Sequence, residues 1–130
     1  MSSSFPTLAS SFKKQFFSHA GVVTLAVFVI CWLVFLGSNL GWGNAIFQHL
    51  HFYSQLSVDA ILQAPHRLLG PAFFHFSWLH IVFNTMWWWQ LGGSIEKSMG
   101  KFSLINLLII SALLSNVGQF YVDGPNFGGL

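Results

Sequence analysis

Residues 75–89 decide how the chain folds, and they read HFSWLHIVFNTMWWW. This stretch is strongly apolar, yet it carries His75, His80 and Asn84. A buried polar group without a hydrogen-bond partner costs about 1–3 kcal/mol. His80 and Asn84 are four residues apart, so a helix places them on one face. Either these side chains bond to each other and to a neighbouring helix, or they face a reacting group.

The composition of the whole chain is that of a membrane protein. Of the 130 residues, 6% are charged and 54% are hydrophobic, whereas about 25% of a typical soluble domain is charged. The single cysteine, Cys31, cannot form an internal disulfide. Only five Lys and Arg residues are present, and they are scattered. We therefore expect a lipid bilayer as the surrounding partner and no nucleic acid.

The hydropathy pattern predicts an all-α membrane protein with three transmembrane helices. In chain order they cover about residues 16–36, 77–93 and 102–120. We expect residues 1–15 to form a short tail, residues 37–76 an interfacial loop with short helices, and residues 122–130 a glycine-rich loop. A cleaved signal peptide is the alternative for the first apolar run, but the run is longer than the usual core of about 7–15 residues.

Basic residues in the short loops predict the orientation. Lys13, Lys14, Lys97 and Lys101 fall on one side of the predicted membrane, and Arg67 falls on the other. The positive-inside rule then makes the N-terminus and the turn at residues 94–101 cytoplasmic. Residues 37–76 and 122–130 face outward, and in a bacterium the membrane would be the inner one.

Two further sets of polar residues have alternative explanations. Ser111, Ser115 and Gln119 form a polar stripe at four-residue spacing on the third helix, and small residues at this spacing also allow helices to pack closely. His75 and His80 are separated by about 140° on a helix, so a straight helix does not bring both to one ion. We expect neither a metal nor another cofactor.

Several short motifs occur together in the second half of the chain. The first is His75-x-x-x-x-His80-x-x-Phe83-Asn84, and the last is the run GPNFGGL at residues 124–130. They are accompanied by Arg67, Leu91-Gly92-Gly93, Glu96, Gly100 and the run ISALLS at residues 110–115. In combination these motifs resemble the rhomboid intramembrane serine proteases. The likeness is dense from about residue 66 onward, and only position and hydropathy agree in the first helix. Pro71 departs from the family pattern, in which a histidine is frequent at this position.

The resemblance implies part of a six-helix rhomboid bundle with a serine–histidine dyad. The family's nucleophile would follow directly after Leu130, and its general base lies on a later helix, so no catalytic residue is assigned among the 130. The resemblance implies that His80, Asn84 and the backbone at Leu130 stabilise the oxyanion. Supporting roles at the outer face or in the structure fall to Arg67, His75, Glu96, Gly128 and Gly129.

The implied function is cleavage of transmembrane protein substrates near the outer membrane face. The 130 residues alone are expected to be inactive because they lack the dyad. One alternative is a non-catalytic rhomboid-like scaffold that binds transmembrane clients. Another is an unrelated small membrane subunit in which His80 and Asn84 join helices.

Overall fold

The structure, a computed structural model, describes residues 7–10 and 19–124. Within residues 19–124 every regular element is a helix. In chain order the elements are α2 (Val22–Gly37), the π-helical turn η1 (Ser38–Trp42), α3 (Gly43–Leu50), α4 (Val58–Gln63), the 3₁₀ turns η2 (Pro65–Leu68) and η3 (Gly70–Phe73), α5 (Trp78–Trp87), the π-helical turn η4 (Trp88–Gly92), α6 (Gly93–Met99) and α7 (Lys101–Asp123).

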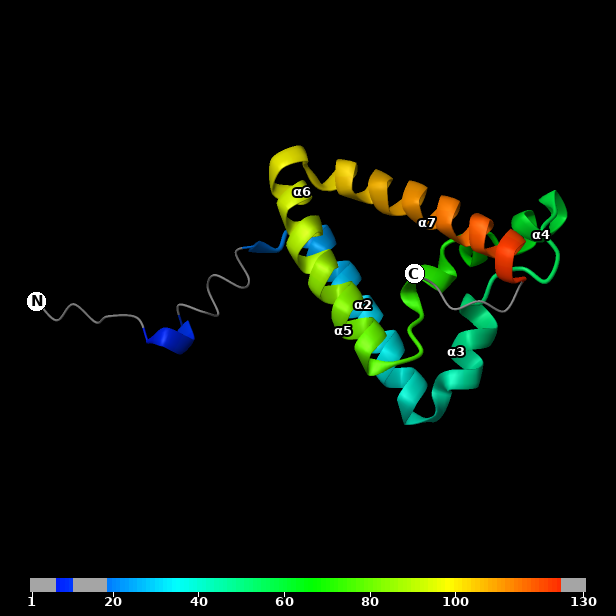
Figure 1. Ribbon diagram of the computed structural model, residues 1–130, viewed down its shortest axis with the longest axis horizontal. Coiled ribbons are helices and arrows are strands. Elements are labelled where there is room, and N and C mark those ends of the chain that lie inside the picture. The colour runs from blue at the N-terminus through cyan, green and yellow to red at the C-terminus, as the bar shows by residue number, and fades with distance from the viewer. Residues whose placement is uncertain (1–6, 11–18, 125–130) are drawn as a thin grey trace, which may run out of the picture.

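Two helical runs lie antiparallel and side by side, as Figure 1 shows: α2, and the continuous run α5–η4–α6. Indole groups join them at two levels. The Nε1 of Trp32 donates to the Oγ1 of Thr85 at 3.2 Å, and the Nε1 of Trp88 donates to the carbonyl oxygen of Thr24 at 2.9 Å. Each bond satisfies the N–H donor of a half-buried indole, which would otherwise be costly to place between helices.

A third contact ties α6 to the start of α2. The carboxylate of Glu96 accepts hydrogen bonds from the backbone N–H groups of Val23 (3.0 Å) and Thr24 (2.8 Å), and from the Oγ1 of Thr24 (2.8 Å). These N–H groups belong to the first turn of α2, where backbone N–H groups have no carbonyl partner within the helix. Gly21 leaves room for the carboxylate, since a Cβ there would lie 2.2 Å from the Cδ of Glu96.

Two predicted helix boundaries are wrong. The first helix does not end at about residue 36, because the chain stays helical through Leu40 and is interrupted at Gly41, whose φ of 109° suits a glycine. The second does not end near residue 93, because its helical run continues to Met99 and stops at Gly100, which has a φ of 91°. Glu96 therefore lies on a helix and not in a turn.

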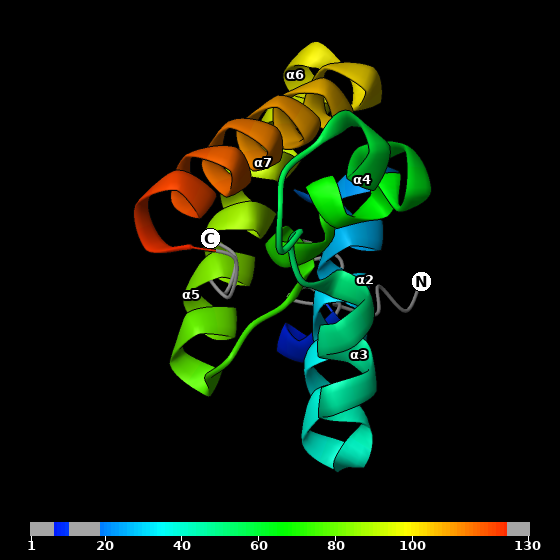
Figure 2. The same ribbon diagram turned by 90° about the vertical axis from the view of Figure 1, so that its right-hand side faces the viewer.

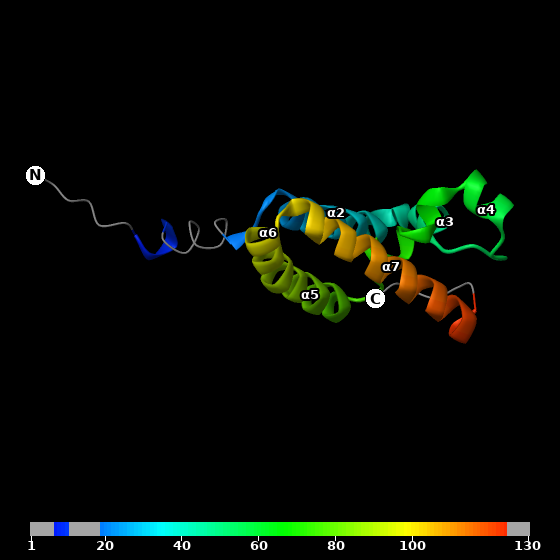
Figure 3. The ribbon, with the colours of Figure 1, turned by 90° about the horizontal axis from the view of Figure 1, so that it is seen from above.

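Helix α7 closes the third side of the molecule. It runs from the end of α6 to the segment that contains α4 (Figure 1). It lies above α5 in Figure 2, and in Figure 3 its first turns lie between α2 and α5. At its far end Val117 and Phe120 pack against the buried pair Phe52 and Tyr53. The predicted interfacial loop is thus a folded segment with its own small core.

Two helical runs are long and apolar enough to cross a membrane, Val22–Leu50 and Lys101–Asp123. Most of their side chains are exposed, unlike those of the core helix of a soluble protein. The helical run at residues 78–99, which contains most of the second membrane helix predicted at residues 77–93, is not one of them within the described residues. Its three consecutive tryptophans, together with His80, Asn84 and Gln90, reduce its mean hydropathy.

Candidate functional site

Ser77 fixes where α5 begins and so where its polar side chains lie. Its Oγ accepts a hydrogen bond from the backbone N–H of His80 at 3.2 Å, as serine often does at a helix N-terminus. The helix therefore starts at Trp78, and His75 lies ahead of it in the connection from η3. From there the His75 ring packs against the His80 ring, with centroids 4.8 Å apart and planes at 63°.

Asn84 lies one turn beyond His80 and contacts His75. Its Nδ2 is 3.3 Å from the Nε2 of His75. The His75 side chain is buried, with 4% of its surface exposed, and Asn84 is half-buried. The four-residue spacing predicted His80 and Asn84 as the central pair. The structure adds His75, so that three polar side chains form one cluster at the start of α5.

Burial keeps His75 neutral. Burial lowers the pKa of His75 to about 4, and the neighbouring His80 acts in the same direction. The backbone of Phe73 acts in the opposite direction, with a smaller effect. A neutral imidazole has one donor and one acceptor nitrogen. It can therefore accept a hydrogen bond from the Asn84 amide and fix the direction of that amide. Within the described residues no group of three or more His, Cys, Asp or Glu side chains is placed to hold a metal ion.

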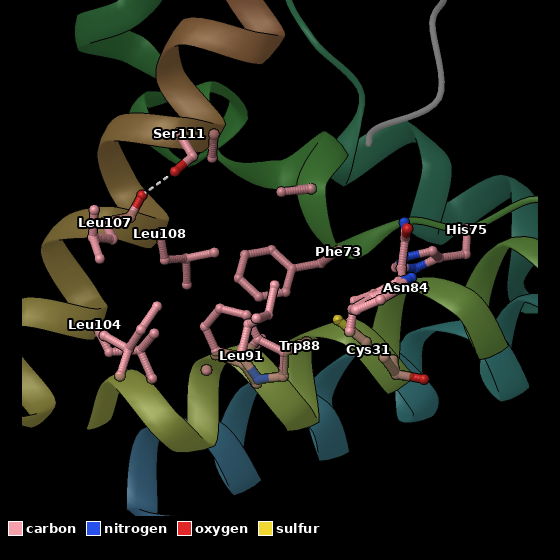
Figure 4. A pocket seen from close by; sticks show the side chains of 17 residues that line it. Cys31, Phe73, His75, Asn84, Trp88, Leu91, Leu104, Leu107, Leu108 and Ser111 are labelled. Atoms are coloured by element: carbon pink, nitrogen blue, oxygen red, sulfur yellow. Dashed lines mark hydrogen bonds between the residues drawn. The ribbon is translucent and has the colours of Figure 1, made fainter. Parts of the chain in front are cut away.

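A cavity of about 420 Å³ lies beside this cluster, between α2, the run α5–η4–α6 and α7. Figure 4 shows His75 and Asn84 at one end and Ser111 at the other. Nearly all other lining side chains are apolar, among them Cys31, Phe73, Trp88, Leu91, Leu104, Leu107 and Leu108. In such surroundings an electrostatic interaction is stronger than in water.

The polar stripe on α7 is not fully buried at any of its three positions, although Ser111 lines the cavity. The Oγ of Ser111 donates to the carbonyl oxygen of Leu107, one turn earlier on the same helix (Figure 4). Ser115 and Gln119 are half-buried and make no side-chain hydrogen bond with other described residues. The buried positions of α7 are Leu104, Ala112 and Asn116.

Arg67 and its neighbour His66 bind the end of α3. The Nη1 of Arg67 donates to the carbonyl oxygen of His51 at 3.1 Å, and the Nε2 of His66 lies 3.0 Å from the carbonyl oxygen of His49. Carbonyl groups at a helix C-terminus have no partners within the helix, and basic side chains commonly bind them. Of the remaining predicted residues, Gly128, Gly129 and Leu130 lie outside the described residues.

Asn116 is a buried polar residue that the four-residue spacing of polar side chains on this helix did not indicate. Its side chain is fully buried, and its Nδ2 donates to the carbonyl oxygen of Leu68 at 2.8 Å. The four-residue spacing indicated the stripe at residues 111, 115 and 119 instead, because periodicity shows which residues share a face but not which face is buried. An asparagine within an apolar helix was the available signal.

These features define a helical integral membrane protein with a polar cluster at the edge of an apolar cavity. The model of the Rhomboid domain family matches residues 63–130, so the chain belongs to the rhomboid family. The resemblance drawn from the motifs is confirmed.

The relatives extend the match to the whole chain. It is 39% identical over 131 residues to "Rhomboid protease GlpG" of Yersinia pestis (strain Pestoides F) and of Yersinia pseudotuberculosis serotype O:3 (strain YPIII), which is 100% of this chain and 46% of each relative. "Rhomboid protease GlpG" of Yersinia enterocolitica serotype O:8 / biotype 1B is 39% identical over 128 residues. The chain thus spans about half the length of the curated relatives it matches.

Proposed function

We propose that the chain forms part of a rhomboid-type intramembrane serine endopeptidase and contributes its oxyanion-binding face. One observation carries the proposal. Asn84, whose Nδ2 is 3.3 Å from the buried His75, lines an apolar cavity in a chain of the rhomboid family. Hydrogen-bond donors fixed in a water-poor site are what the transition state of peptide hydrolysis requires.

In the proposed reaction a serine attacks the carbonyl carbon of a substrate peptide bond, and the carbonyl oxygen becomes negatively charged. Asn84 and His80 donate hydrogen bonds to this oxygen, as do backbone N–H groups near Leu130. One such donor contributes about 10²–10³ to the rate. His75 accepts a hydrogen bond from the Asn84 amide and so fixes the orientation of that amide. The family's nucleophile and general base match none of the 130 residues, so these residues alone would not cleave a substrate.

The proposed substrates are transmembrane proteins cut near the outer face of the membrane. Lys97 and Lys101 lie at the end of the molecule where α6 meets α7, whereas Arg67 lies in the segment at the opposite end. This separation supports a cytoplasmic α6–α7 turn and an outward-facing polar cluster. In a bacterium the protein would then lie in the inner membrane with its N-terminus in the cytoplasm.

A hybrid protein tests the proposal. The segment of the Yersinia pestis relative that aligns with this chain is replaced by the chain, and the hybrid is purified into proteoliposomes with a fluorogenic transmembrane substrate. We expect cleavage, and we expect Asn84→Ala to lower kcat by about 10²-fold while the unfolding midpoint stays near that of the parent hybrid. Asn106→Ala is the matched control, because Asn106 is an exposed asparagine on α7.

Three results would contradict the proposal. One is a folded hybrid that binds the substrate without cleaving it, which is the behaviour of a scaffold. Another is a loss of stability in Asn84→Ala that is as large as the loss of activity, because Asn84 would then only join helices. The third is cleavage by the purified 130-residue chain itself.

A further inference from the structure

Asn116 binds a carbonyl group that has no local donor. Leu68 ends the 3₁₀ turn η2, and the next turn, η3, begins at Gly70. In 3₁₀ geometry the Leu68 carbonyl would accept from the N–H three residues later. That residue is Pro71, which has no N–H. Asn116 supplies the missing donor from α7, with 2.8 Å between its Nδ2 and the Leu68 oxygen.

The segment that Asn116 holds is also bound to α3. His66 and Arg67, within η2, contact the carbonyl groups of His49 and His51. Gly70 packs so closely on the end of α3 that a Cβ there would lie 2.3 Å from the carbonyl oxygen of Leu50. The η2–η3 segment is therefore fixed between two helices, by α3 on one side and by Asn116 of α7 on the other.

The same segment leads directly into the polar cluster. After η3 ends at Phe73, the chain continues through Phe74 to His75, with no long linker between them. Phe74 and His75 are both buried. A displacement of η2 and η3 would therefore move the His75 ring relative to Asn84.

We propose that Asn116 is a positioning residue of the proposed active site: its bond to Leu68 holds η2 and η3 in place, and through them holds His75 opposite Asn84. This inference rests on the proposed function, because it concerns the same oxyanion-binding face. The role requires a donor and not merely a side chain of this size. Within the described residues the Oδ1 of Asn116 has no hydrogen-bond partner, so the Nδ2 makes the one bond of this amide.

Substitutions in the hybrid protein separate the donor from the volume of the side chain. Asn116→Leu keeps a similar size and removes the donor, and we expect kcat to fall about tenfold with KM nearly unchanged. Adding Pro71→Ala to this variant restores an N–H three residues after Leu68, and we expect most of the lost kcat to return. Asn106→Leu and Pro71→Ala alone are the controls, and both should retain the kcat of the parent hybrid.

Asn116→Asp gives a second, nearly isosteric test. An ionised aspartate only accepts hydrogen bonds and so opposes the Leu68 carbonyl, whereas the protonated acid donates again. Burial and the facing carbonyl raise the pKa of such an aspartate, so we expect this variant to keep kcat at low pH and to lose it relative to the parent hybrid as the pH rises through that raised pKa. A pH profile parallel to that of the parent, or no rescue by Pro71→Ala, would overturn the inference.

A measurement without substrate distinguishes failure of this inference from failure of the proposed function. In the 130-residue chain in micelles, the ¹⁵N resonances of the His75 ring report its hydrogen bonding. We expect Asn116→Leu to shift these resonances and Asn106→Leu to leave them unchanged. Unchanged His75 resonances in Asn116→Leu would overturn the inference even if the hybrid is active. An inactive parent hybrid with shifted resonances would instead count against the proposed function alone.

Discussion

Removal of the Glu96 carboxylate should destabilise the contact between α6 and the start of α2. The carboxylate accepts three hydrogen bonds, two from backbone N–H groups and one from the Thr24 hydroxyl, at 2.8–3.0 Å. A hydrogen bond to a charged group contributes about 1.5–3 kcal/mol, and loss of a helix cap costs about 0.5–2 kcal/mol. Glu96 is half-buried, which favours the lower end of each range. We therefore expect Glu96→Ala to lower the free energy of unfolding by about 2–4 kcal/mol, and Glu96→Gln by about half as much, because one acceptor oxygen remains.

The assay is unfolding of the 130-residue chain in mixed micelles with an increasing fraction of SDS, followed by tryptophan fluorescence. Lys97→Ala is the control, since Lys97 is an exposed neighbour on the same helix. Equal unfolding midpoints for Glu96→Ala and Lys97→Ala would refute the reasoning, because the carboxylate would then add nothing to the packing of α2.

Acidic pH should remove the stabilisation that the Glu96 carboxylate contributes to the fold. Burial acts to raise the pKa of Glu96, but hydrogen bonds from Thr24 and Val23 outweigh it and hold this pKa below its usual value. A depressed carboxyl pKa stabilises the fold above the pKa of the unfolded side chain, about 4.3. The contribution is lost as the pH falls through the lower pKa of the folded state. Below about pH 4 the free energy of unfolding should therefore fall less steeply with decreasing pH in Glu96→Gln than in the parent chain.

Three further perturbations follow from single contacts. The pKa of His75 is lowered to about 4, so between pH 4 and about pH 6.5 the unfolded state binds more protons than the folded state. The stability of the chain, measured by SDS titration, should therefore fall as the pH is lowered through this interval. It should fall less in His75→Gln. Gly70→Ala places a Cβ 2.3 Å from the Leu50 carbonyl oxygen, so it should destabilise the chain by about 1–3 kcal/mol, and an unchanged unfolding midpoint would disprove this close approach. Trp88→Phe removes the donor to the Thr24 carbonyl and should cost about 1 kcal/mol in the same titration, whereas no loss would show that the indole bond contributes nothing.

The sequence predicted a helix boundary well where residues close to that boundary determine it. Ser77 precedes an apolar run and starts α5 at Trp78. The apolar run of the third helix was predicted over about residues 102–120, and α7 covers Lys101–Asp123. The prediction failed at the end of the first helix, which was expected at about residue 36. The side chains of Ser38 and Asn39 bond back to Val34 and Phe35, so these residues remain helical.

The contacts that assemble the site could not be predicted, because they join residues far apart in the chain. Glu96 lies 72 residues from Thr24, and Asn116 lies 48 residues from Leu68. Helical periodicity correctly placed His80 and Asn84 on one helix. It could not show that His75, which lies outside the helix, folds back onto Asn84, since that contact depends on the course of the chain through η3.

The π-helical turn at Trp88–Gly92 determines which way Glu96 faces. Asn84 and Glu96 are twelve residues apart, and in a regular α-helix they would be separated by about 120° around the axis. A π turn contains about one residue more than an α turn. The angle between Asn84 and Glu96 around the helix axis is therefore that of eleven residues in a regular α-helix, about 20°. Both the cluster at the cavity and the cap on α2 can therefore be built on one side of a single helical run. A regular α-helix of unchanged length would instead rotate Glu96 by about 100° relative to Asn84, whereas a regular helix with one residue fewer in this turn would keep the two positions aligned. The extra residue in this turn must therefore be taken up as π-helix for Glu96 to face α2.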